Sequence, residues 1–245
     1  MGVYMKTISM TAYNRPDYLD QTLKNLCNNN PKDWSLFISV DPSIETNNIV
    51  SVINNVNGFK NITYVVNSIR KNHRLNQHDS ISMAFTAGST FNLHLDDDLF
   101  LSPDALLLAD FYNNTFMSKP MTFGSYGLFN YGSNPSQPDR LISRANTFTG
   151  LGWCIFRENW NFVFHPNWFT DNFSTKYFKA NTYGWDWNIH GAFREFGLSE
   201  IFPAFSRTNH AGREHGTCCS PEFYDKSFKN LQWNQHLMIK EYFYE

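Results

Sequence analysis

The sequence of 245 residues lacks the hallmarks of a membrane-inserted or disulfide-framed protein. No stretch approaches the roughly 18 consecutive apolar residues of a membrane helix. The first six residues form neither a signal peptide nor a myristoylation site. The four cysteines, at positions 27, 154, 218 and 219, are too few and too irregular for a disulfide framework. We therefore expect a soluble, cytoplasmic protein of a cellular or viral source, without membrane insertion.

Charged residues are also scarce. They make up 17% of the chain, against about 25% in an average protein. The 20 basic and 22 acidic residues give a formal net charge of -2, so nothing global attracts nucleic acid or an anionic membrane. Aromatic residues reach 17% and asparagine is frequent. This composition suits a site that binds sugars or nucleobases through stacking and neutral hydrogen bonds, but an AT-rich genome produces the same bias without a functional cause.

Hydrophobic patterning predicts alternating strands and helices in the first half of the chain. We expect strands over residues 3–12, 36–40, 62–66 and 91–95, and helices over residues 16–27, 46–56 and 80–87. Such alternation is typical of an α/β fold with a Rossmann-like, mostly parallel sheet flanked by helices. In such sheets ligands bind at the carboxyl ends of the strands.

The second half of the chain is less regular. Gly, Asn, Pro and Ser crowd residues 124–139 and predict a long loop. Beyond it we expect strands over 141–148 and 198–202, helices over 151–160 and 185–196, and a C-terminal helix after Pro221. No linker or internal repeat is visible, which predicts a single domain over residues 1–245 with a smaller mixed region in its second half.

Three consecutive carboxylates follow the strand expected over residues 91–95. Like charges at this spacing raise one another's pKa unless a cation or hydrogen bonds compensate them. Asp96, Asp97 and Asp98 are hard oxygen ligands that suit Mg²⁺ or Mn²⁺, which also bind diphosphate oxygens. The alternative is a solvated acidic turn that caps a helix beginning at Ser102 and Pro103. The position at the end of the fourth strand favours a metal site.

The chain resembles glycosyltransferases of the GT-A fold, whose Asp-x-Asp-type (DXD) motif holds a metal ion and a nucleotide-sugar diphosphate. It is most similar to the branch of the Golgi N-acetylglucosaminyltransferase that starts complex N-glycans. Seven short segments carry the resemblance in the family's order: residues 15–19, 39–41, 72–74, 96–98 with 102–104, 150–153, 185–187, and 205–208 with 215–216. Two departures are that Asp96 replaces a usual Glu and that residues 185–187 have one Asp fewer, so the alignment around the base can slip by one residue.

The resemblance implies a free catalytic domain without the membrane anchor and stem of the Golgi enzymes. Residues 1–104 would form the nucleotide-sugar-binding half and residues 105–245 the acceptor-binding half with the C-terminal helix. The activity implied is inverting, metal-dependent transfer of a hexosyl, N-acetylhexosaminyl or pentosyl group. The donor would be a nucleotide sugar, UDP-linked, and the acceptor a hydroxyl group.

The resemblance also assigns residues to roles. Asp98 and Asp96 would bind Mn²⁺ or Mg²⁺, and Asp186 would act as general base. The implied donor-binding residues are Arg15, Asp41, Asn72, His73, Arg74, Asp96, Asp97, Arg207 and His215. The implied acceptor-binding residues are Gly152, Trp153 and Trp187.

Structural alternatives exist for several of these residues. A carboxylate at Asp186 also stabilises the start of a helix, and Arg207 equally suits a pair with a structural carboxylate. His210 and His215 with Cys218 and Cys219 do not match the spacing of a compact zinc site.

Two other functions use similar parts. A sugar-phosphate nucleotidyltransferase would need a Gly-rich basic loop near the N-terminus, and residues 11–16 contain no glycine and one arginine. A non-catalytic carbohydrate-binding module would use the acidic cluster to hold Ca²⁺. The acceptor is open among a glycan, a lipid-linked sugar, a protein side chain and a hydroxylated nucleobase in DNA. For DNA the basic residues would be Lys60, Arg70, Lys71 and Arg74.

Overall fold

A large mixed sheet organises the computed structural model of the protein, which describes residues 4–179, 184–214 and 219–244. Nine strands follow the order β11-β7-β9-β6-β8-β4-β1-β2-β3, and β5 and β10 form a separate two-stranded sheet. The strands are β1 (Lys6–Ala12), β2 (Trp34–Val40), β3 (Asn61–Val66), β4 (Phe91–Leu95), β5 (Leu99–Leu101), β6 (Ser125–Gly127), β7 (Arg140–Ala145), β8 (Trp153–Phe156), β9 (Ser199–Pro203), β10 (Thr208–His210) and β11 (Phe243–Tyr244).

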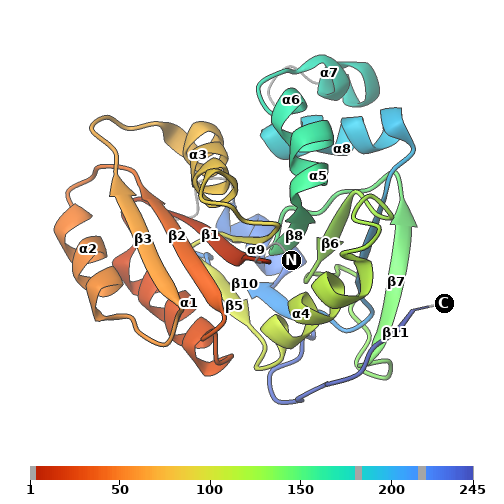
Figure 1. Cartoon of the computed structure of the whole chain (residues 1–245), viewed down its shortest axis with the longest axis horizontal. Helices are drawn as coiled ribbons and strands as arrows, with labels where there is room; N and C mark the ends of the chain where they lie inside the picture. The colour runs from red at the N-terminus through yellow and green to blue at the C-terminus, as the bar shows by residue number, and fades with distance from the viewer. Residues whose placement is uncertain (1–3, 180–183, 215–218, 245) are drawn as a thin grey trace.

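The helices lie on the faces and at one end of this sheet (Figure 1). They are α1 (Pro16–Asn28), α2 (Thr46–Asn55), α3 (Asn72–Thr86), α4 (Ala105–Phe116), α5 (Arg157–Asn159), the π-helical turn η1 (Trp160–Phe164), α6 (His165–Asn167), α7 (Asn172–Phe178), α8 (Trp185–Phe196) and α9 (Pro221–Ser227). Within the described ranges no helix has the length and apolar character to cross a membrane.

The first four long strands form the parallel part of the sheet. β1 pairs with β2 on one side and with β4 on the other, and β2 pairs with β3, all in parallel. The chain moves outward from β1 to β3 and then returns to β4. Right-handed crossovers therefore put α3 on the face opposite to α1 and α2. The carboxyl ends of β1, β2 and β4 meet at one edge.

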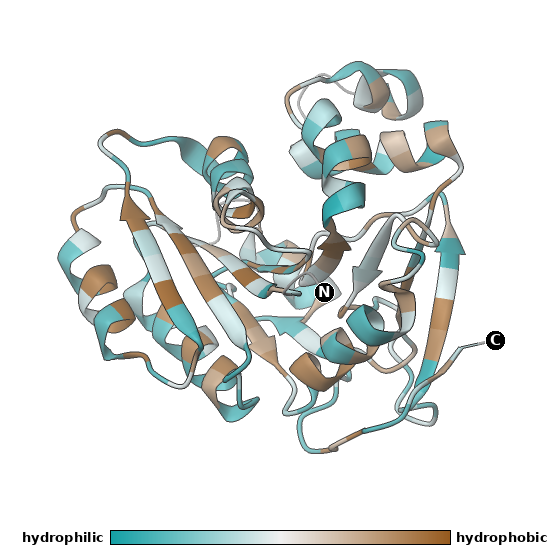
Figure 2. Cartoon of the chain, viewed as in Figure 1, coloured by the Kyte–Doolittle hydropathy of each residue, from teal (hydrophilic) through white to brown (hydrophobic). Residues whose placement is uncertain are grey.

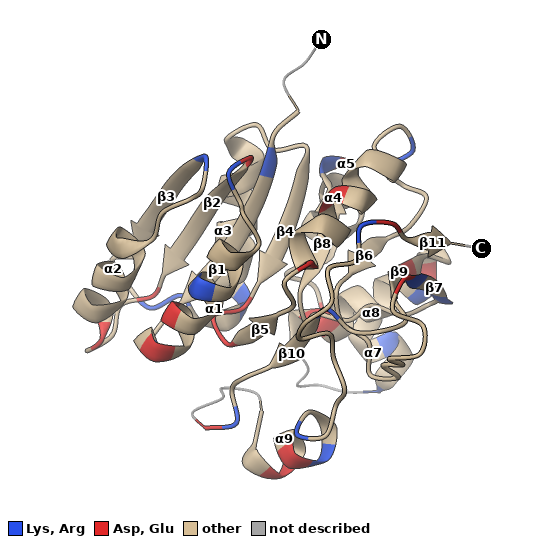
Figure 3. Cartoon of the chain, turned by 90° about the horizontal axis from the view of Figure 1, so that it is seen from below, with Lys and Arg blue, Asp and Glu red and all other residues tan. Residues whose placement is uncertain are grey.

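The antiparallel part begins where β8 joins β4, with His94 opposite Trp153. Both halves of the chain thus contribute to one sheet. Apolar side chains from both build its core, and Figure 2 shows hydrophobic residues in the strands and, interspersed with hydrophilic ones, on the helices. The strands β2 and β3 carry no charged residue, and charges lie mainly at strand ends and on helices (Figure 3).

The predicted elements of the first half are confirmed except for the start of α3. The sequence predicted a helix over residues 80–87, but the helix begins at Asn72. Its first turns bury the polar residues Asn76, Gln77 and His78, so they show no apolar periodicity.

In the second half, the helix predicted over residues 151–160 is wrong. Residues 153–156 form the fully buried strand β8, and the helical segment begins only at Arg157. A short buried apolar run does not distinguish a strand from a helix by periodicity. The predicted long loop over 124–139 also contains β6.

Candidate active site

The acidic segment lies in the turn between β4 and β5. Asp97 and Asp98 are 4% exposed, and Arg15 from the start of α1 compensates both. Its Nη1 lies 2.6 Å from Oδ2 of Asp98, and its Nη2 pairs with Oδ1 of Asp97. Figure 3 shows basic and acidic residues close together around α1 and β5. The loop after β1 and the loop after β4 thus meet through this ion-pair network.

Asp96 contacts the first turns of α3. Gln77 Nε2 donates a hydrogen bond of 2.6 Å to Oδ1 of Asp96, and His73 Nε2 lies 4.0 Å from the same oxygen. Burial, together with neighbouring carboxylates, raises the pKa values of Asp96 and Asp97 to about 7. A divalent cation would relieve this cost, since it stabilises the charged carboxylates.

The donor set fits a hard divalent metal ion bound in part by substrate. No group of three or more His, Cys, Asp or Glu that could hold a metal occurs in the described ranges. Mg²⁺ and similar ions usually need only one or two carboxylates, with phosphates and water completing the coordination. Asp98 and Asp96 satisfy that requirement, and Gly212 leaves room beside Asp98. A Cβ at position 212 would lie 2.4 Å from Oδ2 of Asp98.

His210, which the sequence analysis considered only as a zinc ligand, lies beside Asp98. It lies on β10, which pairs with β5, and its Nε2 is 3.8 Å from Oδ2 of Asp98. The Gly212 N–H donates to His210 Nδ1 over 3.0 Å, which assigns the ring proton to Nε2 in the neutral ring. Burial lowers the pKa of His210, so the ring presents a neutral N–H donor. The sequence signal that could have identified His210 as a site residue is its position two residues after the 205–208 segment.

Asp186 occupies the first turn of α8. Burial raises its pKa, while hydrogen bonds from backbone N–H groups of residues 186 and 187 and the nearby His73 oppose that rise. His73 feels the charges of both Asp186 and Asp98, and burial lowers the pKa of its imidazole. His73 of α3 is therefore within electrostatic reach of both the acidic turn and Asp186 of α8.

Tyr131 is a residue that the sequence reasoning missed. It belongs to the long loop after β6, and its ring is 52% exposed. Partial burial and the charge of Asp186 raise its pKa, and its ring packs against Phe129 and Phe228. No local pattern distinguishes it from the other aromatic residues of the loop.

Asp41 and Asn72 are structural neighbours at the start of α3. Asp41 is 2% exposed. It accepts hydrogen bonds from the backbone N–H groups of Lys71 and Asn72 and from Asn67 Nδ2. Asn72 adopts a φ of 63° and is exposed. Asp41 thus shapes the loop that presents Asn72 and His73.

Arg207 is buried inside the fold, which corrects its predicted donor contact, whereas Arg74 is bonded to the segment after α6 and its donor contact stays a prediction. Arg74 donates from Nε and Nη2 to the carbonyl groups of Trp168 and Thr170. Arg207 is 0% exposed, and its Nε lies 2.9 Å from Oδ2 of the equally buried Asp104. Arg74 also pairs with the exposed Asp171 over 3.2 Å, and Arg207 additionally donates to the carbonyl groups of Phe205 and Pro138.

The three predicted acceptor residues separate into two groups. Gly152 and Trp153 are buried beneath the site: a Cβ at Gly152 would lie 3.1 Å from Thr208, and Trp153 is 0% exposed and stacks on Phe164. Direct acceptor contact is therefore wrong for both. Trp187, the residue after Asp186 on α8, is 39% exposed and packs against Phe178 and His190, so its acceptor contact stays a prediction. The predicted donor residue His215 lies outside the described residues.

Comparisons with known proteins agree with this architecture. Residues 7–109 match the family described as Glycosyl transferase family 2. A similar solved structure is the mannosyltransferase PcManGT from Pyrobaculum calidifontis in complex with GDP-Man and Mn²⁺. It has a TM-score of 0.56 and 14% identity, with 87% of this chain and 59% of that chain covered. Another is S. aureus TarS 1-349 in complex with UDP-GlcNAc. It has a TM-score of 0.55 and 12% identity, with 90% and 64% covered.

These similarities define the class of fold. The chain has the α/β GT-A architecture, as the sequence predicted, and its first half carries the glycosyl transferase family 2 similarity. This chain covers only 59% to 64% of the lengths of those two solved structures. A search of the curated proteins yields no match.

Proposed function

We propose that the protein is an inverting, metal-dependent glycosyltransferase that uses a nucleotide-sugar donor. The observation that carries this proposal is the convergence of Asp96, His73 and Asp186. His73 lies 4.0 Å from Asp96 and within electrostatic reach of Asp186. This arrangement supports a site in which Asp96 and Asp98 would bind a metal-bound diphosphate and Asp186 would accept a proton. The match to glycosyl transferase family 2 over residues 7–109 supports the same class.

In this proposal the acidic turn binds the diphosphate of the donor. Asp98 and Asp96 would hold Mn²⁺ or Mg²⁺. When bound, the ion neutralises negative charge on the departing nucleoside diphosphate. The neutral Nε2–H of His210 lies beside Asp98 and suits donation to a phosphate oxygen. Arg15 neutralises the negative charge of Asp97 through their ion pair. It also adds positive charge near the phosphate oxygens of the donor.

Asp186 would act as general base toward the acceptor. It removes the proton of the acceptor hydroxyl as that oxygen bonds to the anomeric carbon and the bond to the diphosphate oxygen breaks. A single displacement inverts the anomeric centre. Burial raises the pKa of Asp186, and a base whose pKa is closer to the operating pH is more effective.

The donor and the acceptor are proposed from the sequence resemblance, the similar solved structures and the exposed aromatic residues. The donor would be UDP-linked, because the sequence resembles a branch that uses UDP-sugars and TarS was solved with UDP-GlcNAc. Because PcManGT was solved with GDP-Man, a screen of candidate donors should also include GDP-sugars. We propose a glycan as the acceptor, with the exposed side chains of Trp187, which follows Asp186 on α8, and Tyr131 as aromatic surfaces for it. A hydroxylated nucleobase in DNA is the acceptor to test next, since bases also stack on aromatic rings.

The test is a donor screen with purified protein. Nucleotide sugars are incubated with Mn²⁺ or with EDTA, and released nucleoside diphosphate and pyrophosphate are both measured. We expect metal-dependent diphosphate release from one donor and its loss in Asp98→Ala. The control Asp20→Ala removes an exposed carboxylate paired with Lys24 and should retain activity.

Three other results would contradict the proposal. Pyrophosphate release would identify a nucleotidyltransferase. If the protein binds sugar but shows neither turnover nor, by calorimetry, metal-dependent nucleotide binding, it is a binding module. A product that retains the donor's anomeric configuration, seen by NMR, would exclude the single displacement.

A further inference from the structure

A cavity lies outside the site described above, between the second half of α1, β5 and the C-terminal segment. It has a volume of about 490 Å³. Its polar lining comes from the side-chain amides Asn25, Asn28, Asn209 and Gln235, together with His236. Its aromatic wall is Phe100 stacked on Trp233, with ring centroids 5.9 Å apart and an interplanar angle of 23°.

The two-stranded sheet separates this cavity from the candidate active site. Neighbouring residues of a strand point to opposite faces. Asn209 pairs with Phe100, and His210 pairs with Leu99. His210 faces Asp98, so Asn209 and Phe100 lie on the other face, where they line the cavity. The cavity is therefore adjacent to the active site but opens away from it.

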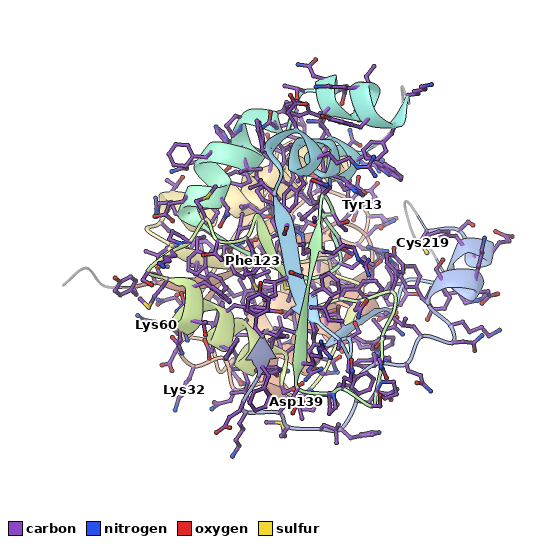
Figure 4. The ribbon with its side chains drawn as sticks, turned by 90° about the vertical axis from the view of Figure 1, so that its right-hand side faces the viewer. Tyr13, Lys32, Lys60, Phe123, Asp139 and Cys219 are labelled. Carbon is purple, nitrogen blue, oxygen red and sulfur yellow. The ribbon has the colours of Figure 1, made fainter. Side chains whose placement is uncertain are left out.

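A second cavity of about 240 Å³ extends the first. The two share Asn28 and Pro103, and the second continues along Asn29, Asn30 and Lys32 toward Met238. The C-terminal segment borders both, and Figure 1 shows it passing beneath β5 and α4 on its way to β11. Figure 4 shows Lys32 toward one end of the molecule and Tyr13, which follows β1, nearer the other. We name the two cavities together the amide groove.

The amides of the groove divide into anchored and available groups. Asn29 donates from Nδ2 to the carbonyls of Asn25 and Ser102, and its Oδ1 accepts from the Leu106 N–H. Asn25 Oδ1 accepts from the Leu101 N–H. These bonds fix the wall. Asn28 and Gln235 are exposed, and no hydrogen bond to a described residue engages their side chains.

The lining chemistry selects the class of ligand. The described residues that line the larger cavity include no Asp, Glu, Lys or Arg, and the smaller cavity has Lys32 together with Asp33 and Asp110. Phosphate or carboxylate groups therefore find no net positive charge in the groove. Amides offer a donor and an acceptor side by side, which suits adjacent sugar hydroxyls. The indole and phenyl faces suit the apolar faces of sugar rings.

We propose that the amide groove binds a neutral oligosaccharide, independently of the nucleotide site. Trp233 and Phe100 contact sugar faces, and Asn28, Asn25 Nδ2 and Gln235 bind hydroxyl groups. The groove would hold part of a glycan chain on the molecule while the active site is empty or occupied. This assignment does not rest on the proposed transferase activity.

The test measures binding of short neutral oligosaccharides to the full chain in EDTA without nucleotide. Gluco-, manno-, xylo- and chito-oligosaccharides at millimolar concentration are compared by calorimetry and tryptophan fluorescence. One of these classes should bind. Trp233→Ala and the doubly substituted N28A/Q235A should each weaken binding about tenfold or more, which corresponds to about 1.4 kcal/mol.

Controls separate this groove from the active site and from misfolding. Phe162→Ala removes an aromatic side chain that is 70% exposed elsewhere and should leave oligosaccharide binding unchanged. Asn28 and Gln235 are surface residues, so their variant keeps the fold even if Trp233→Ala does not. Nucleotide binding should be the same in N28A/Q235A and the natural sequence.

Several outcomes would overturn the assignment. These are the absence of binding by every neutral class, unchanged binding in N28A/Q235A, competition by UDP or GDP, and preference for sulfated or phosphorylated glycans. Because the readout needs no turnover, it can fail while the transferase proposal holds, and it can succeed while that proposal fails.

Discussion

Aspartates in this protein have different roles because their oxygens have different partners. Asp104 is fully buried and accepts from Arg207, Ser102, Asn234, Tyr242 and the Ile239 N–H. Asp41 likewise accepts from two backbone N–H groups and one amide. Their negative charges are satisfied within the fold, which suits a structural role. Asp96 and Asp186 have fewer donors and raised pKa values, which is typical of groups that meet a ligand.

Replacing Asp186 should separate chemistry from binding. Asp186→Asn keeps the shape of the side chain but removes the proton acceptor. We expect transfer to fall about 10² to 10⁴-fold, with donor and Mn²⁺ affinity unchanged by calorimetry. In the natural protein the acidic limb of the kcat/KM profile should lie above the usual pKa of an Asp, because burial raises that of Asp186. Near-normal transfer by Asp186→Asn would show that the base lies elsewhere.

Replacing Arg15 should make the protein more dependent on metal. Arg15→Gln removes the cation that pairs with Asp97 and Asp98. Breaking a buried ion pair costs about 3 kcal/mol or more, so the Tm in EDTA should fall. Mn²⁺ should then raise the Tm more than it does for the natural protein. The exposed pair Lys24–Asp20 provides the control Lys24→Gln, and equal Mn²⁺ shifts in all three proteins would argue against a metal at Asp98.

At the scale of elements, the helical segment from α5 to α8 packs along α3. His78 bonds to His165 over 2.9 Å, Phe85 stacks on Trp160, and a further pair of bonds joins the first turn of α3. Arg74 donates to the Trp168 carbonyl over 2.9 Å, and Trp168 Nε1 donates back to the Arg74 carbonyl over 2.8 Å. Asn188 of α8 accepts from the N–H groups of residues 173 and 174 at the start of α7. These bonds fix the distance between α3, which carries His73, and α8, which carries Asp186.

Arg74 is therefore a positioning residue, and its replacement should affect chemistry more than donor binding. Arg74→Ala frees the Trp168 and Thr170 carbonyls and loosens α3 from the α6–α8 helices. We expect kcat to fall about tenfold, because small misplacements of a base reduce rates steeply, with a smaller change in donor KM. Arg144→Ala, at an exposed residue of β7, is the matched control. A purely donor-binding arginine would instead raise KM without lowering kcat.

At the scale of the whole molecule, one sheet joins the two halves of the chain, and the buried Glu200 lies in its antiparallel part. Glu200 on β9 is 0% exposed, and Ser125 Oγ donates to its Oε1 over 3.0 Å. Its Oε2 has no hydrogen-bond partner among the described residues. Burial raises the pKa of Glu200 to about 8, so the folded protein retains a proton there that the unfolded chain loses.

This linkage predicts how stability depends on pH. The contribution of Glu200 is complete below the pKa of the unfolded chain and declines as pH rises toward about 8. In that window the free energy of unfolding should fall by up to about 1.4 kcal/mol per pH unit from this group. Glu200→Gln should reduce that slope and be the more stable protein at pH 8 in urea titrations. The exposed Glu241→Gln should not, and a slope unaltered in Glu200→Gln would show that Glu200 is ionised in the fold.

The sequence by itself determined the parallel half of the sheet and the position of its polar strand ends. Apolar runs of period two and helical spacing report burial locally, and the crossover rule then orders the strands. Asp96 to Asp98 after β4 and Arg15 after β1 could be placed at one edge by this reasoning alone, although their roles stay predictions.

The tertiary structure alone decided which polar residues face a ligand and which face the core. Arg74, Arg207 and Trp153 resemble site residues in sequence, yet each is occupied by packing or by internal acceptors. His210 meets Asp98 because β10 pairs with β5. Such pairings join residues more than one hundred positions apart, and a side chain's partner across that separation depends on the whole packed core rather than on any local pattern.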